Sequence, residues 1–239
     1  MAQIVAKPFR LALLQLAGLN ATKANNISVA RAAVKKAAES KPKPDLIVLP
    51  EIWNSPYAVT AFEQYSERVP NVKNGKEEPA KGEEGESITA LREMARDNGV
   101  WLIGGSIPEK EDGTNNIYNT LTAYNPEGEM VAKHRKVHLF DIDIPGRQKF
   151  KESDSLSPGM TLNSFEAPFG KIGVGICYDI YGHSSVVNPL GDVMEEADEN
   201  EAIVYADIDP EMLATTRRNL PVTIQRRFDV YPDVANPKN

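Results

Sequence analysis

The sequence predicts an α/β protein, and three observations support this fold class. Apolar runs typical of buried strands alternate with segments in which apolar residues recur every three or four positions, as in amphipathic helices. Strands that alternate with helices in this way pair in parallel, because parallel neighbours need a long crossover connection. Further along the chain, strand-like runs follow one another through short turns, which indicates antiparallel hairpins.

The first half of the chain contains the alternation of strands and helices. Apolar runs at residues 10–16 and 45–51 are separated by residues 20–40, where the apolar positions follow a helical period. A second helix is predicted over residues 86–98 and a third strand over residues 100–105. These five segments are expected to form the parallel part of a sheet with its crossover helices.

The second half is predicted to contain short strands and one helix. We expect strands at residues 117–124, 129–133, 164–167, 171–177, 184–188 and 202–208. A short helix is predicted over residues 210–219, followed by an extended arm that contains two prolines, from 231 to 239. Two charged stretches, residues 73–86 and 195–201, are predicted to be solvated loops or turns.

The composition limits the class of protein. Hydrophobic residues make up 41% of the 239 residues, which is enough to bury a core and excludes disorder as the main state. The net charge of −7 argues against a non-specific nucleic-acid binder. One cysteine excludes an internal disulfide and points to a reducing compartment. Without an apolar leader or a membrane-spanning run, the chain is expected to be a cytoplasmic protein, with mitochondrial placement as the alternative.

Cys177 is a candidate nucleophile. It follows the apolar run at residues 172–176, so it is expected at the carboxyl end of a strand, where α/β folds expose reactive side chains. A lone cysteine is more commonly a small buried hydrophobe. Both interpretations remain open from this feature alone.

Glu51 and Lys136 are candidates for acid–base chemistry. Glu51 follows an apolar strand, and is either a solvated strand end or a carboxylate at the rim of the sheet whose partial burial raises its pKa. Lys136 lies in a basic cluster of the kind that is usually solvated, but it alternates with Val137 and Leu139 and could point inward with them. The three histidines are too scattered to predict a metal site, and are expected to be structural.

Together these residues form a recognisable set. The segments Leu49-Pro50-Glu51, His-Arg-Lys-Val-His-Leu-Phe at 134–140 and Gly-Ile-Cys-Tyr-Asp at 175–179 occur in this order. In this they resemble the nitrilase, or carbon–nitrogen hydrolase, superfamily, and most closely its omega-amidase branch. The resemblance covers about residues 9–231, so residues 1–8 are expected to be an N-terminal extension and 232–239 a C-terminal tail.

The resemblance implies a fold and a catalytic set. Glu51, Lys136 and Cys177 match the family's catalytic triad, and Glu152 matches a second glutamate that orients the lysine and the substrate. The family fold is a four-layer α-β-β-α sandwich whose chains pair into dimers, so we expect a homodimer. The expected partner is a small-molecule amide, with no nucleic acid and no membrane.

The resemblance also implies a mechanism that uses no metal or organic cofactor. Glu51 takes the proton of Cys177, and the thiolate attacks an amide carbonyl to form a thioester. Lys136 and the backbone N–H of Tyr178 stabilise the oxyanion, and Tyr57 belongs to the substrate-binding residues. Ammonia leaves, and water then hydrolyses the thioester.

The sequence departs from the family after Ile180. The family continues there with an Arg-Phe-Pro-Glu-like segment, two helices and two strands, whereas Ile180 runs directly into Tyr181. The absent block amounts to about 60 residues, at ~30 residues per repeated unit of strand and helix. It includes the arginine expected to bind the carboxylate of the substrate. We therefore expect one half of the sandwich to be incomplete, with an open sheet edge and uncovered apolar faces.

Two hypotheses of different class follow. The first is an amide hydrolase of the omega-amidase type, acting on a small dicarboxylate monoamide. The second is a catalytically inactive relative that is stable only as a subunit or in complex with a partner, or that is not stably folded. The catalytic motifs favour the first hypothesis, and the absent block favours the second.

Overall fold

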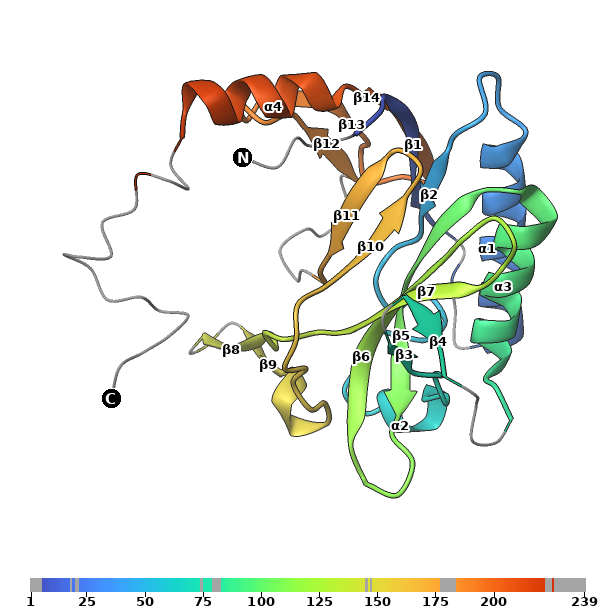
Figure 1. Cartoon of the computed structure of the whole chain (residues 1–239). Helices are drawn as coiled ribbons and strands as arrows, with labels where there is room; N and C mark the ends of the chain where they lie inside the picture. Colours follow the sequence, from blue (N-terminus) through green and yellow to red (C-terminus); the bar gives the residue numbers. More distant parts are fainter. Residues whose placement is uncertain are drawn as a thin grey trace.

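A six-stranded mixed sheet forms the centre of the computed structural model (Figure 1). The structure describes residues 6–17, 19, 22–73, 75–78, 83–144, 146, 148–176, 184–221 and 225. The strand order is β14-β1-β2-β5-β6-β7. The bounds of these strands are β1 Phe9–Gln15, β2 Leu46–Val48, β5 Trp101–Lys110, β6 Ile117–Tyr124, β7 Met130–Arg135 and β14 Ala202–Ile208.

The pairing within this sheet changes from parallel to antiparallel along the chain. β1, β2 and β5 are parallel neighbours, and helices α1 (Lys23–Ala38) and α3 (Glu86–Asn98) lie in the connections between them. β5, β6 and β7 form an antiparallel meander, and β14 pairs antiparallel with β1. The predicted parallel start and the predicted hairpins are therefore both confirmed.

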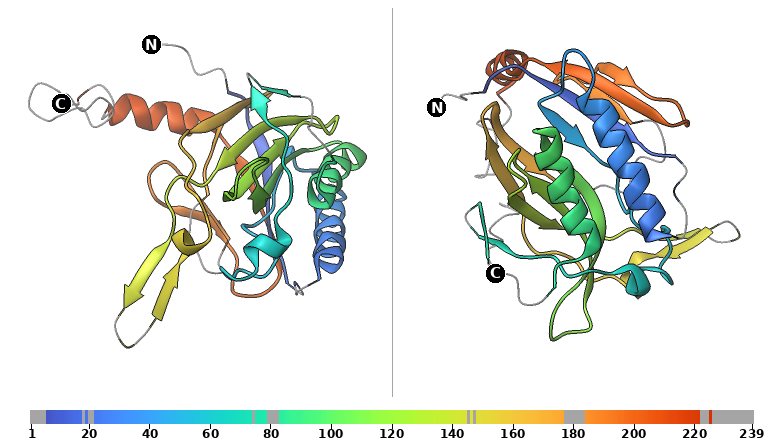
Figure 2. Two further views of the ribbon diagram at one scale, coloured as in Figure 1. Left: turned by 90° about the horizontal axis from the view of Figure 1, so that it is seen from below. Right: turned by 90° about the vertical axis from the view of Figure 1, so that its right-hand side faces the viewer.

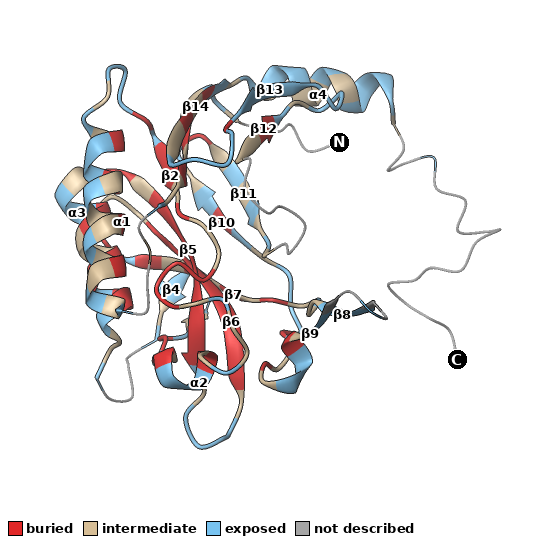
Figure 3. Ribbon diagram, turned by 180° about the vertical axis from the view of Figure 1, so that it is seen from behind, coloured by how far each residue is buried: buried red, intermediate tan, exposed pale blue. Residues whose placement is uncertain are grey.

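Helices α1 and α3 run side by side over one face of the sheet, as the blue and green helices of Figure 2 show. Each turns its apolar stripe toward the sheet, and Figure 3 shows the buried side of each helix facing inward. Val34 of α1 and Leu91 of α3 are fully or almost fully buried, in a core that also contains Trp53 and Leu102. Burial of these stripes stabilises the helices far more than their intrinsic propensity does.

The opposite face of the sheet is covered by the hairpin of β10 (Asn163–Ala167) and β11 (Gly170–Val174). Its aromatic residues pack on the sheet: Phe165 stacks on Trp101 at 5.7 Å between ring centroids, and Phe169 stacks on Phe9 at 4.4 Å. The sheet is thus enclosed between a helical layer and the start of a second β layer.

The second β layer consists of separate hairpins. β12 (Ser185–Val187) pairs only with β13 (Val193–Glu196) among the described strands, and neither of them joins β10 or β11. Helix α4 (Pro210–Asn219) contains no buried residue. Large apolar side chains are exposed in this part of the chain: Val187, Leu190, Val193, Met194, Met212 and Leu220. This arrangement agrees with the expectation that one half of the sandwich is incomplete.

Several segments differ from the sequence prediction. Residues 73–86 are not merely a solvated loop, because strands β3 (Val72–Lys73) and β4 (Lys76–Glu77) form a hairpin there. Both Glu77 and Glu84 pair with Arg92 of α3, and these ion pairs attach the described parts of the charged stretch to the helix. In the acidic stretch at residues 195–201, the first two residues end β13, and residues 197–201 form the predicted connection between two strands, β13 and β14.

Other small elements complete the fold. Helix α2 (Phe62–Tyr65) packs against β5, and a 3-10 turn at Glu152–Asp154 follows the hairpin of β8 (Asp141–Ile144) and β9 (Gln148–Lys151). This last hairpin was not predicted, because the alternation of polar and apolar residues in Asp141–Ile144 spans only four positions. The expected strand at residues 45–51 is limited to β2, since Pro50 lacks an N–H for the sheet and the chain turns there. None of the helices within the described ranges is long and apolar enough to cross a membrane.

Candidate functional site

Glu51 lies in a strained turn three residues after the end of β2. The next residue, Ile52, has φ of +48°, a conformation that a β-branched residue rarely adopts. The N–H of Ile52 donates to Oγ of Ser106 on β5 at 3.1 Å, and the N–H of Ser106 donates to the carbonyl of Pro50 at 3.3 Å. These two bonds hold the turn against its strain and so fix where the Glu51 side chain begins.

Gly105 allows β5 to approach this turn. Its φ is +61°, and a Cβ at this position would lie 2.0 Å from the carbonyl oxygen of Pro50. The register of β5 against β6 shifts between Ile103 and Ser106. This break in the β5–β6 pairing lies next to Glu51, because Ser106 donates to the carbonyl of Pro50. The close approach of the two backbones therefore depends on the absence of a side chain at position 105.

Gly105→Ala is expected to lower the free energy of unfolding by well over ~1 kcal/mol, because it adds a steric clash to an unfavourable φ. Gly113→Ala is the matched control: Gly113 has φ of +75° but no atom within 4 Å of the position of a Cβ. Urea denaturation of both variants gives their losses in free energy of unfolding. The loss in Gly113→Ala reports the cost of placing alanine at positive φ, and the additional loss in Gly105→Ala reports the clash with Pro50. Equal losses in the two variants would show that the contact with Pro50 carries no strain.

Lys136 follows β7 and is almost completely buried, with 1% of its side chain exposed. Its N–H donates to the carbonyl of Asn119 at 2.8 Å, and its own carbonyl accepts from the N–H of Gly159 at 2.7 Å. The ammonium Nζ lies 3.0 Å from Oε1 of Glu51 and 3.1 Å from Oε1 of Glu152. A buried ammonium between two carboxylates is neutralised on both sides, which offsets the cost of its desolvation.

Glu152 is fully buried in the 3-10 turn after β9. Besides Lys136, it accepts from the hydroxyl of Tyr57 at 2.5 Å on Oε1 and from the N–H of Phe140 at 2.8 Å on Oε2. Burial and the hydrogen bond to Glu152 raise the pKa of Tyr57 well above its ordinary value of 10.0. Tyr57 is 42% exposed, so its hydroxyl end joins the buried cluster while its ring borders the surface.

Glu51 has the properties of a general base at the rim of a protein core. Burial raises its pKa above the ordinary value of 4.5, and the charge and hydrogen bond of Lys136 and the hydrogen bond of Asn119 offset only part of this effect. The carboxylate of Glu152 raises the pKa further. With 21% of its side chain exposed, Glu51 is the member of the carboxylate pair that a reactant can reach.

The structure brings together four of the six expected site residues. Glu51, Lys136, Glu152 and Tyr57 form one connected cluster of hydrogen bonds. Cys177 and Tyr178 lie outside the described residues, which stop at 176 on this side, two positions after β11. The described part of the cluster can hold and move a proton, and it presents a cation beside the base.

Two further residues of this site were not found from the sequence. Asn119 on β6 donates from Nδ2 to Oε1 of Glu51 at 2.7 Å, and Ser106 supports the turn after Glu51. Asparagine is depleted in strands, so its presence in the middle of an otherwise strand-forming segment is a signal that could have identified it. A buried polar residue on a strand needs a partner, and here the partner is Glu51.

The histidines are not part of the site within the described ranges. His134 is buried on β7, its Nδ1 lies 3.2 Å from Nδ2 of Asn163, and burial lowers its pKa. His138 is exposed, and His183 lies outside the described residues. His134 is thus a hydrogen-bonded structural histidine, as expected.

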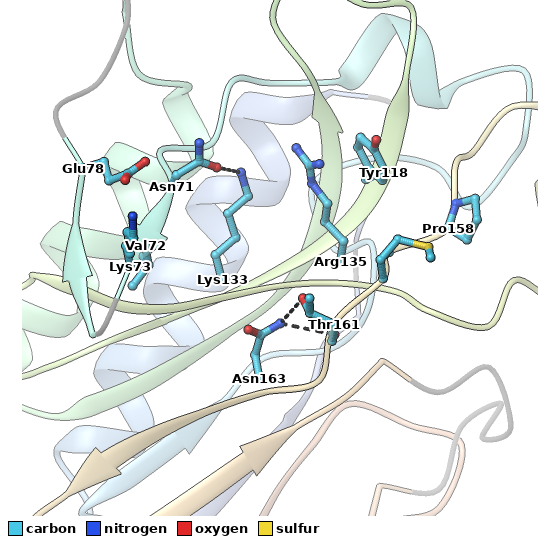
Figure 4. A pocket seen from close by; sticks show the side chains of 12 residues that line it. Asn71, Val72, Lys73, Glu78, Tyr118, Lys133, Arg135, Pro158, Thr161 and Asn163 are labelled. Atoms are coloured by element: carbon cyan, nitrogen blue, oxygen red, sulfur yellow. Dashed lines mark hydrogen bonds between the residues drawn. The ribbon is translucent and has the colours of Figure 1, made fainter. Parts of the chain in front are cut away.

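A cavity of about 440 Å³ lies beside β7, apart from this cluster (Figure 4). Lys133 points across it toward Asn71, and Arg135 lies over the ring of Tyr118 at 3.7 Å. Both cations are already paired with the buried Glu109, at 2.6 Å and 2.7 Å. The lining contains none of the expected site residues.

Comparison with known proteins identifies the family. The carbon–nitrogen hydrolase family model matches residues 10–181, more than half of the chain. The chain is 37% identical to omega-amidase NIT2 of Danio rerio, over 93% of this chain and 96% of that protein. It is 35% identical to omega-amidase NIT3 of Saccharomyces cerevisiae, over 97% and 98% of the two chains. The alignment with the Danio rerio protein runs over 285 positions, more than the 239 residues of this chain, so that protein has residues without a counterpart here.

Solved structures agree with this result. The crystal structure of Saccharomyces cerevisiae Nit3, described as a member of branch 10 of the nitrilase superfamily, matches with a TM-score of 0.80 at 31% identity. The match covers 95% of this chain and 99% of that one. The Caenorhabditis elegans NitFhit protein shares the fold, with a TM-score of 0.73 at 21% identity over 95% of this chain and 67% of that one. With its α/β sandwich and its match over most of its length, this chain belongs to the carbon–nitrogen hydrolase family of the nitrilase superfamily.

Proposed function

We propose that this chain hydrolyses the amide bond of a small dicarboxylate monoamide through a thioester on Cys177. The observation that carries the proposal is the buried Lys136 between Glu51 and Glu152, with Glu51 partly exposed and its pKa raised. A base of raised pKa beside a fixed cation suits a reaction in which a proton moves while negative charge develops.

In each half-reaction of the proposed mechanism, Glu51 first takes a proton and then returns it. Glu51 takes the proton of Cys177, and the thiolate attacks the carbonyl carbon of the amide. Lys136 and the backbone N–H of Tyr178 stabilise the tetrahedral oxyanion. Glu51 returns the proton to the amide nitrogen, the carbon–nitrogen bond breaks, and ammonia leaves.

The second half-reaction regenerates the thiol. Glu51 removes a proton from a water molecule, whose oxygen attacks the thioester carbon. The carbon–sulfur bond then breaks, the carboxylic acid leaves, and Cys177 recovers its proton from Glu51. Glu152 holds Lys136 in place throughout, since it also accepts from Tyr57 and from the backbone of Phe140.

The class of substrate follows from the relatives. The Danio rerio and Saccharomyces cerevisiae proteins are named omega-amidases, and we extend that activity to this chain. The family arginine expected to bind the substrate carboxylate has no match in this sequence after Ile180, so the carboxylate would be held less firmly than in those relatives. Weaker binding of the substrate carboxylate is expected to raise KM, while the reaction that the chain catalyses stays the same.

Release of ammonia from succinamate tests the proposal, with butyramide as the matched substrate that has a methyl group in place of the carboxylate. We expect slow release from succinamate, less from butyramide, and none above background from Cys177→Ala. Equal rates on the two amides would contradict the dicarboxylate preference. Release that persists in Cys177→Ala would contradict the thioester mechanism.

One observation favours the second candidate function, an inactive relative that acts as a subunit or bound to a partner. The hairpins β10–β11 and β12–β13 do not join one sheet, and Val187, Val193 and Met194 are exposed beside them. Uncovered apolar surface of this kind is typical of interaction surfaces. Two results together would support this alternative: the protein folds only in the presence of a partner, and it releases no ammonia from any amide.

A further inference from the structure

We infer that Asn119 is a positioning residue that directs the Glu51 carboxylate and favours its ionised form. The inference goes beyond the proposed function, and it rests on that function only where it concerns turnover. None of the motifs that assign the family includes this residue, and its role follows from four features of the structure.

The first feature is that Asn119 contacts both Glu51 and Lys136. Its side-chain Nδ2 donates to Oε1 of Glu51 at 2.7 Å, and its backbone carbonyl accepts from the N–H of Lys136 at 2.8 Å. Asn119 lies in the middle of β6, inside the central sheet, and is fully buried. A rigid strand therefore sets the relative position of the base and the cation.

The second feature is which oxygen of Glu51 is held. Both Asn119 Nδ2 and Lys136 Nζ bind Oε1, the latter at 3.0 Å. A carboxylate oxygen that already accepts two donors is a poor site for a proton. Proton uptake is therefore assigned to Oε2, and Asn119 determines the direction in which that oxygen points.

The third feature is the cost of keeping an amide at this position. Oδ1 of Asn119 is buried and has no hydrogen-bond partner within the described part of the chain. A buried acceptor without a partner destabilises the fold, whereas an apolar side chain of similar shape would not. The benefit of the amide at this position is thus its donor to Glu51, and not the stability of the strand.

The fourth feature is the balance of charge around Glu51. Burial and the carboxylate of Glu152 oppose the ionisation of Glu51, while Lys136 and Asn119 favour it. The hydroxyl of Tyr57 also lies within hydrogen-bond reach of Glu51. The net effect raises the pKa of Glu51 above 4.5. Removal of the Asn119 donor shifts this balance further toward the protonated acid.

Asn119→Leu tests the inference through the ionisation of Glu51, independently of turnover. The protein is labelled with ¹³C at the glutamate carboxyl carbons, and the Glu51 resonance is identified by its loss in Glu51→Gln. The titration midpoint of Glu51 should rise by about one pH unit in Asn119→Leu, since a hydrogen bond to a charged group favours the charged form by that order. The midpoint of thermal unfolding should stay the same or rise, because the unpartnered Oδ1 is removed.

Thr120→Val is the matched control. Thr120 is the next residue on β6, is buried, and donates to the buried Glu109 at 2.6 Å, but successive strand residues point to opposite faces. This variant should leave the Glu51 midpoint where it is. If Asn119→Leu does not fold, Asn119→Thr serves instead, because its hydroxyl is too short to reach Glu51 and the same rise is expected.

Ammonia release separates this inference from the proposed function. In an active protein, the acid limb of kcat/KM should move upward by the same amount as the Glu51 midpoint in Asn119→Leu. A midpoint that moves in a protein without any turnover would support the role of Asn119 and count against the amidase. A Glu51 midpoint that is unchanged in both Asn119→Leu and Asn119→Thr would overturn the inference.

Discussion

Lys136→Met and Glu51→Gln are each expected to lower kcat on succinamate by ~10⁴-fold or more, nearly as far as Cys177→Ala, because residues that act as a unit in catalysis are strongly non-additive. The cluster is connected: Lys136 Nζ binds Glu51 at 3.0 Å and Glu152 at 3.1 Å. Loss of one member therefore disables the others.

The physical reason is clearest for Lys136→Met. Without the ammonium, Glu51 and the fully buried Glu152 would be neighbouring carboxylates with no cation between them. Ionisation of Glu51 would then be less favourable, because the charge and hydrogen bond of Lys136 that lower its pKa are lost while the carboxylate of Glu152 still raises it. The variant therefore loses the oxyanion contact and also weakens the base. Glu51→Gln retains the shape of the side chain but cannot accept the proton of the thiol.

Lys133→Met is the matched control for this prediction. Lys133 is also a mostly buried lysine, paired with a buried glutamate, Glu109, at 2.6 Å. Its loss should lower the free energy of unfolding but leave most of the turnover. The mass of the protein after brief mixing with succinamate reports the thioester, since the chain has one cysteine. A Lys136→Met protein that forms the thioester at a normal rate would contradict the role of Lys136.

The second large effect is expected from restoring the absent block. Insertion of a family-type segment between Ile180 and Tyr181 should raise turnover by about 100- to 1000-fold, the effect that one fixed oxyanion donor has on rate. We expect the insertion to support the backbone N–H of Tyr178, and to return the arginine that positions the substrate carboxylate. Turnover of succinamate by the two forms is the measurement.

The insertion should also change stability. In the 239-residue chain the second β layer is split into hairpins, and residues such as Val187 and Met194 are exposed beside them. We expect this chain to bind a hydrophobic dye and to associate, and the longer form to bind less dye and to unfold at a higher temperature. A Gly/Ser insertion of equal length is the control and should recover neither property. A monodisperse 239-residue protein with a sharp thermal transition and fast ammonia release would contradict this prediction.

Elements with a strong local pattern could be predicted from the sequence alone. Helix α3 lies at the predicted residues because its apolar stripe has a helical period and Gly99, with φ of +56°, ends it in the left-handed conformation. Helix α4 begins at its Pro210, after the Asp209 side chain accepts from the backbone N–H of Glu211. β14 contains the strand-forming run Ile203-Val204-Tyr205. Such signals act over a few residues and need no distant partner.

Elements without such a pattern could not be predicted. The hairpins β3–β4 and β8–β9 have strands of only two and four residues, which are too short for a hydrophobic period to identify them. The left-handed turn at Ile52 is held by the distant Ser106, so no local signal indicates it.

For the site, the sequence determined the types and order of the candidate residues, and therefore the family and the expected chemistry. It left open whether Glu51 is a solvated strand end and whether Lys136 is a surface cation. Only the tertiary structure decided these points, by joining Glu51 to Lys136 across 85 residues and to Asn119 across 68. The ionisation of Glu51 depends on how much water is excluded and which donors are close. Both are properties of the packed sheet, which brings together residues that lie far apart along the chain.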